Sequence, residues 1–177
     1  MIELLVLLFL AGVTVKIADE FSDVFEKENY LGIIFGIIYG FLLGYAMSVN
    51  EIAATVFLGV ITGVAVTKKL DSFSHLIGLF MIIFTIIFLG NFKPEIFIAL
   101  VLFIAIFADE KFNDYFDRIK GKGLNKLLGT IAEFRLTSHF ITIIISFILM
   151  QSLYWFSLLS FDLGYQLVTI ISEKIKH

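Results

Sequence analysis

Apolar residues gather into six runs along the chain, each long or nearly long enough to cross a membrane. The runs predict helices at about residues 2–18, 30–47, 52–66, 76–89, 96–108 and 138–158. Several are short for a hydrocarbon core of about 30 Å, so we expect these helices to continue through their polar ends. The pattern predicts an all-α, polytopic membrane bundle of about six transmembrane helices, within a range of five to seven.

The longest hydrophilic stretch, residues 109–135, is predicted to be a cytoplasmic polar segment. Residues 161–171 are too few to cross again, and we interpret them as a continuation of the sixth span or an interfacial helix, with a seventh span as the alternative. Composition supports one membrane domain over residues 1–177, because 59% of the residues are hydrophobic and only 16% are charged. The absence of cysteine excludes disulfides, thiolate catalysis and cysteine-ligated metals.

The distribution of basic residues predicts an orientation. In a six-span topology, the loops after spans one, three and five share one face, and that face holds ten of the 13 lysines and arginines. They are Lys16, Lys27, Lys68, Lys69, Lys111, Arg118, Lys120, Lys122, Lys126 and Arg135. Lys93, Lys174 and Lys176 fall on the other face. The positive-inside rule makes the crowded face cytoplasmic and places the N-terminus outside.

Glycine recurs at every fourth position through the second run, at Gly32, Gly36, Gly40 and Gly44. Such a strip lets another helix backbone approach closely. We interpret it as a surface for packing within the chain, with a homo-oligomer formed through the same glycines as the alternative.

Two acidic clusters occur where apolar runs end, and their sequences are similar. Ala18-Asp19-Glu20 opens the first and Ala108-Asp109-Glu110 opens the second, which suggests a parallel internal repeat. Carboxylates from two helix ends can ligate a hard cation, so we predict a site for Mg²⁺ or another divalent cation. The predicted ligands are Asp19, Glu20, Asp23, Asp109, Glu110, Asp114 and Asp117. The alternative is that these acids only solvate the membrane interface.

A third polar group lies on the same predicted face. Asp71 and His75 are four residues apart, so on a helix the carboxylate could orient the imidazole as an acid/base pair. Lys16, Lys68, Lys69 and Arg118 are candidate phosphate-binding residues, although lysines here are also typical interfacial anchors. We interpret His139, one turn after Arg135, as an interfacial residue, and Tyr39 as a member of an aromatic belt or a lipid contact.

Residues 113–118, Asn-Asp-Tyr-Phe-Asp-Arg, resemble the first Asp-rich motif of UbiA-type intramembrane prenyltransferases. The resemblance covers these six residues and implies binding of Mg²⁺ and a prenyl diphosphate. The chain is too short for the nine helices of that family and lacks its further Asp after the motif.

Three functions are consistent with these patterns. The first is an integral membrane enzyme, dependent on a divalent cation, that acts at the cytoplasmic face on a lipid or isoprenoid phosphate. The second is a cation transporter or channel with an acidic cytoplasmic vestibule, and the third is a noncatalytic membrane subunit or scaffold. Membrane lipids are the expected partners, and nothing indicates nucleic-acid binding.

Overall fold

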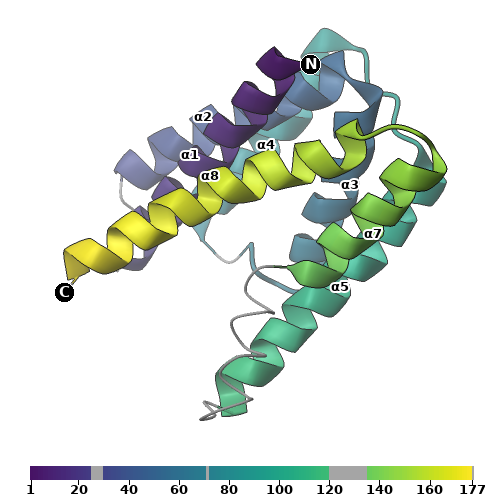
Figure 1. Ribbon diagram of the computed structural model, residues 1–177. Helices are drawn as coiled ribbons and strands as arrows, with labels where there is room; N and C mark the ends of the chain where they lie inside the picture. Colours follow the sequence, from purple (N-terminus) through teal and green to yellow (C-terminus); the bar gives the residue numbers. More distant parts are fainter. Residues whose placement is uncertain (25–29, 71, 120–134, 177) are drawn as a thin grey trace.

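The computed structural model describes residues 1–24, 30–70, 72–119 and 135–176, and every regular element in these ranges is an α-helix (Figure 1). The prediction of an all-α fold is therefore confirmed. The helices are α1 (Ile2–Val24), α2 (Tyr30–Val49), α3 (Glu51–Val66), α4 (Phe73–Leu89), α5 (Ile96–Ile119), α7 (Leu136–Ile148) and α8 (Leu153–Lys176).

Polar caps fix several helix boundaries between apolar runs. The Asn50 side chain accepts a hydrogen bond from the backbone N–H of Ala53 at 2.9 Å and begins α3. Ser72 begins α4 in the same way. Gly90 ends α4 in the left-handed conformation, with φ of 66°. The chain therefore reverses at short, defined connections.

The prediction of one continuous span over residues 138–158 is wrong. α7 ends at Ile148, Met150 adopts a left-handed φ of 53°, and α8 starts at Leu153. The Ser146 hydroxyl accepts a hydrogen bond from the backbone N–H of Trp155 at 3.1 Å and closes the turn. Hydropathy missed this break because apolar residues flank it on both sides. The last helix consequently returns along the bundle.

α8 packs beside α1 and runs in the same direction (Figure 1). Gly12 lies against the backbone of Phe161, and Gly164 lies against the backbone of Phe9. A β-carbon at either glycine would collide with the opposite helix, so the two backbones cross at close range. We call the end where α1, α5 and α8 finish the polar end, and the opposite end the far end.

The glycine strip of α2 packs on α4 of the same chain. Gly36 lies against Ser74, Gly40 against Gly78, and Gly44 against Ile82 and Thr85. All four glycines of the strip are buried, so a second copy could reach them only by displacing α4. Of the two interpretations of this strip, packing within the chain and a homo-oligomer, packing within the chain fits the described contacts.

The helices form two groups that diverge toward the polar end. In one group α1 contacts α2, α4 and α8, and α2 packs on α4. In the other, α3 packs on α5, which contacts α7. Figure 1 shows α8 and α5 finishing on different sides of the molecule. Near the far end the groups meet in an apolar core that includes Leu8, Met47, Phe57, Leu158 and Phe161.

Within the described ranges, α2 is the one helix that is both long and apolar enough to cross a membrane by those two measures. α3, α4 and α7 are apolar but have fewer than 18 residues.

Replacing Gly164 by leucine is expected to destabilise the fold by about 1–3 kcal/mol, because the new side chain would push α8 away from α1. Thermal unfolding of the purified protein measures the change. Leu163→Val, at a neighbouring exposed position, is the matched control and should leave the unfolding temperature nearly unchanged. Equal unfolding temperatures for Gly164→Leu and the wild type would contradict the close crossing.

Candidate functional site

A cavity of about 690 Å³ lies between the two helix groups. Every described helix contributes to its wall. Its acidic, basic and histidine lining residues are Lys16, Asp19, Lys69, His75, Asp109, Glu110, Arg135, His139, Asp162 and Glu173. The cavity thus brings together residues from both acidic clusters and from the third polar group of the sequence.

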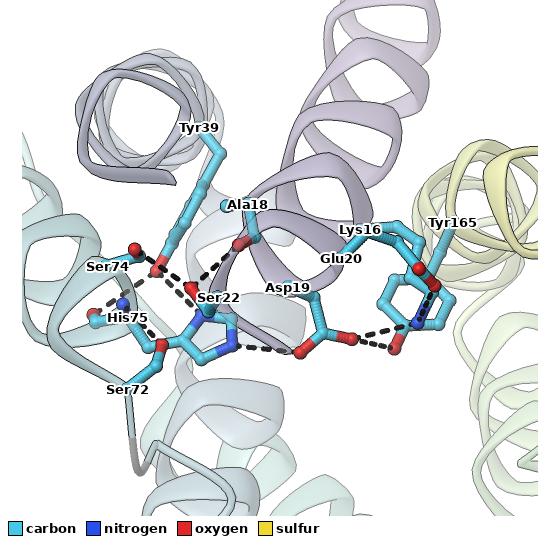
Figure 2. A network of polar contacts seen from close by, with 10 residues as sticks. All are labelled: Lys16, Ala18, Asp19, Glu20, Ser22, Tyr39, Ser72, Ser74, His75 and Tyr165. Carbon is cyan, nitrogen blue, oxygen red and sulfur yellow. Dashed lines mark hydrogen bonds and ion pairs between the residues drawn. The ribbon is translucent and has the colours of Figure 1, made fainter. Parts of the chain in front are cut away.

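Asp19 is the centre of the polar network on the α1 side (Figure 2). One carboxylate oxygen, Oδ2, accepts hydrogen bonds from Lys16 Nζ at 2.9 Å and from the Tyr165 hydroxyl at 3.2 Å. The other, Oδ1, lies 3.4 Å from His75 Nε2. One carboxylate therefore joins α1, α4 and α8.

His75 is held in place from α2 and by its own helix start. The Tyr39 hydroxyl lies 3.3 Å from His75 Nδ1 and also donates to the His75 carbonyl at 3.2 Å. Ser72 accepts a hydrogen bond from the His75 backbone N–H. Both imidazole nitrogens thus have polar neighbours. The predicted partner Asp71 lies outside the described residues, and among described residues it is Asp19 that faces the imidazole (Figure 2).

Asp109 is buried and caps the start of α7 from the neighbouring helix α5. Its carboxylate accepts hydrogen bonds from the backbone N–H groups of Thr137 at 3.0 Å and Ser138 at 2.8 Å, and from the Ser138 hydroxyl at 2.6 Å. A carboxylate at a helix N-terminus satisfies free N–H groups and interacts favourably with the helix dipole. Its contacts in the described structure fit a structural cap.

Arg135 bridges two carboxylates from different helices. Its guanidinium lies 3.1 Å from Glu110 Oε1 on α5 and 3.5 Å from Asp162 Oδ1 on α8. Burial alone would lower the pKa of Arg135, but Asp162 and Glu110 outweigh it and raise the pKa above its usual value. The arginine therefore stays charged and ties α5 to α8.

Among the remaining candidate residues whose side chains are described, Lys69 lines the cavity and the others do not. Lys69 lines the cavity and pairs with Asp114 at 2.7 Å, whereas Lys68 is exposed. Glu20 pairs with Lys16 at 3.0 Å and accepts a hydrogen bond from Ser172. The side chains of Asp23, Asp117 and Arg118 lie outside the described residues.

The described side chains do not form a metal site. No group of three or more histidines, aspartates or glutamates among them is placed to hold a metal ion. The described acids of the two clusters instead contact Lys16, Lys69, Arg135, His75 and the start of α7. The prediction of a shared magnesium site has no support in this part of the chain.

Sequence reasoning missed several residues of the site. Asp162 and Tyr165 went unnoticed because they lie in the segment interpreted as a continuation of the sixth span. His139 was interpreted as interfacial, yet its Nε2 lies 3.1 Å from Asp162 Oδ2. One signal was available: the pair Ser-His occurs at 74–75 and again at 138–139, near the start of an apolar helix each time.

Searches of family models, of curated proteins and of solved structures each found no match. The six-residue resemblance to the prenyltransferase motif is therefore not accompanied by a family match.

The stability of the protein should depend on the ionisation of Asp19. Burial alone would raise its pKa, but the hydrogen bonds from His75 and Lys16 lower it well below its ordinary value of 3.8. A lowered pKa gives stability that is complete above the ordinary value and is lost as pH falls toward the folded-state value.

Asp19→Asn should therefore lose roughly 2 kcal/mol at neutral pH, since Lys16 and His75 each lose a charged partner. Its unfolding temperature should also fall less than that of the wild type as the pH is lowered through about 4. Thermal unfolding as a function of pH measures both effects. Glu3→Gln, an exposed acid at the far end, is the control. Parallel pH curves for Asp19→Asn and the wild type would refute the role of this carboxylate.

Proposed function

We propose that this chain crosses a membrane with its helix bundle and carries a cationic solute through the acidic cavity. Support for the membrane comes from 40 large apolar side chains that are exposed among the described residues. Phe80, Phe84 and Phe88 stack in a row along α4, and each is more than half exposed. Contiguous apolar surface of this extent is typical of contact with lipid.

Charge supports an orientation for this proposed bundle. The basic residues at the polar end whose side chains are described are Lys16, Lys68, Lys69, Lys111, Arg135 and Lys174, while Lys93 precedes α5 at the far end. Because α8 returns to the polar end, Lys174 joins the crowded face instead of opposing it. The positive-inside rule then favours a cytoplasmic polar end and an external N-terminus.

The observation that carries the proposed function is the excess of acid in the cavity. Among the described residues, five carboxylates line it, against three lysine and arginine side chains. Lys16, Lys69 and Arg135 are each already paired with carboxylates. A cavity of this charge attracts cations and repels phosphates, because apolar walls concentrate the field inside it.

The cavity is closed toward the far end by apolar packing. Phe57 and Phe161 both line it, and their rings meet edge to face with centroids 5.3 Å apart. A second cavity of about 300 Å³ lies at the far end, between Met1, Asn50 and Leu153. Two cavities separated by a packed core are consistent with a carrier that is open at one face.

The lipid-phosphate enzyme has less support from the described contacts. The candidate phosphate-binding lysines Lys16 and Lys69 are engaged by carboxylates, and Asp109 caps a helix. A divalent cation stays a prediction.

Cysteine scanning tests the topology, since the native chain contains no cysteine. A membrane-impermeant maleimide should label Lys93→Cys in intact cells, and Lys111→Cys and Lys174→Cys only after permeabilisation. The unmodified chain is the control. Labelling of Lys174→Cys together with Lys93→Cys would contradict the return of α8 to the polar face.

Cation binding is tested on vesicles reconstituted with the purified protein and adsorbed to a solid-supported membrane. A concentration jump of methylammonium should produce a transient current that empty vesicles lack. Glu173→Lys, at an exposed position on the cavity lining, should weaken the response severalfold, whereas Glu3→Lys at the far end should not. A response to glycerol phosphate without one to methylammonium would overturn the proposal in favour of a phosphate ligand.

A further inference from the structure

Three buried polar atoms of the cavity wall lack a hydrogen-bond partner among the described residues. They are Asn113 Oδ1 on α5, His139 Nδ1 on α7 and Asp162 Oδ2 on α8. Asp162 Oδ2 lies 3.1 Å from His139 Nε2, but the contact lacks hydrogen-bond geometry. Buried polar atoms are nearly always paired, so three of them on one wall indicate a place where a ligand binds.

The chemistry of these atoms selects a hydrogen-bond donor. The oxygens of Asn113 and Asp162 can only accept, and a neutral imidazole nitrogen of His139 can accept as well. A primary ammonium presents three N–H donors and a full charge, which suits a carboxylate with further acceptors on the same wall. A quaternary ammonium has no N–H and cannot satisfy them.

Charge on this wall also favours an ammonium group. Asp109, Glu110 and Asp162 place three carboxylates here, and Arg135 is the fixed positive charge among them. On the opposite wall, Asp19 already has Lys16, Tyr165 and His75 as partners. The free acceptor capacity therefore lies on the side of α5, α7 and α8.

The inner part of the cavity is apolar. Leu43, Val60, Leu79 and Ile82 line it, together with the Phe57–Phe161 pair that closes it. A cavity of about 690 Å³ exceeds what a small ion fills and lies within the range of sites for organic ligands. Leu163 and Ile170, both about half exposed, also line it, so apolar side chains continue from its wall to the outer surface.

From these observations we infer that the ligand is an amphipathic primary amine in its protonated form. Its ammonium group binds at Asp162 with Asn113 and His139 as further acceptors, and its hydrocarbon part lies against the inner apolar wall. This inference rests on the proposed function and narrows it from any cation to an alkylammonium.

Isothermal titration of the protein in lipid nanodiscs tests the ligand class with defined probes. Hexylammonium should bind at least about tenfold more tightly than methylammonium, because its chain buries additional apolar surface. It should also bind more tightly than hexanol, which lacks the charge, and than tetramethylammonium, which lacks N–H donors. Empty nanodiscs give the background from partitioning into lipid.

Variants locate the ammonium group. Asp162→Asn should weaken hexylammonium binding about tenfold or more, and Asp162→Glu should restore part of the affinity. Asn113→Ala keeps every charge of the site and should weaken hexylammonium binding severalfold. This variant tests the same wall if Asp162→Asn fails to fold. Glu3→Gln at the far end is the matched control and should bind as the wild type does.

The outcomes separate this inference from the proposed function. Binding of methylammonium with no gain for hexylammonium would overturn the inference and leave the cation carrier standing. Absence of binding by either amine would overturn both. Unchanged hexylammonium affinity in both Asp162→Asn and Asn113→Ala would show that the ammonium group does not bind at this wall.

Discussion

The polar end of this bundle depends on pairing charges that are withdrawn from water. An unpaired charge at such a site costs several kcal/mol, whereas a pair with satisfied hydrogen bonds is tolerated. Two sets of ion pairs meet this condition. Lys16 pairs with Asp19 and Glu20 within α1. Arg135 pairs with Glu110 on α5 and Asp162 on α8. The Arg135 pairs link α5 of one helix group to α8 of the other, and Lys16, Asp19, Glu110, Arg135 and Asp162 all line the cavity.

The two halves of the chain use similar residues in different ways. Each has an Ala-Asp-Glu motif late in a helix and a Ser-His pair near the start of another helix that it contacts. In the first half the aspartate faces the histidine, as Asp19 faces His75. In the second half Asp109 binds Ser138 and its backbone, and His139 turns to Asp162 instead. The first arrangement leaves a carboxylate oxygen facing an imidazole, and the second uses up the carboxylate as a cap.

The sequence predicted the positions of the helices better than the contacts between their polar side chains. Apolar runs located α1 to α5, and the expectation that polar residues from distant parts of the chain meet agrees with the cavity lined by Lys16, His75 and Glu110. The partners of the individual polar side chains could not be derived from the apolar pattern. Spacing of four residues suggested Asp71, which lies outside the described residues, as a partner for His75. The partner that the structure does describe is Asp19, because the helix that follows Ser72 lies beside α1. Local spacing cannot report contacts across 56 positions of chain.

The break between α7 and α8 escaped detection for a related reason. Gln151 and Ser152 are two adjacent polar residues in a long apolar stretch. Hydropathy averaged over a window the length of a span stays high across them. Asp162 and Tyr165 were overlooked together with that break. Both belong to α8, whose residues were divided in the prediction between the sixth span and a continuation or interfacial helix.

The parallel pairing of α1 with α8 has a consequence for biosynthesis. α1 receives Tyr165 and Ser172 as partners only from α8, 146 positions later in the case of Asp19 and Tyr165. Until α8 has been synthesised, the acidic end of α1 lacks these two hydroxyl donors. Assembly of the cavity is thus a late event, and a chain that stops before α8 exposes an incomplete carboxylate network to cellular quality control.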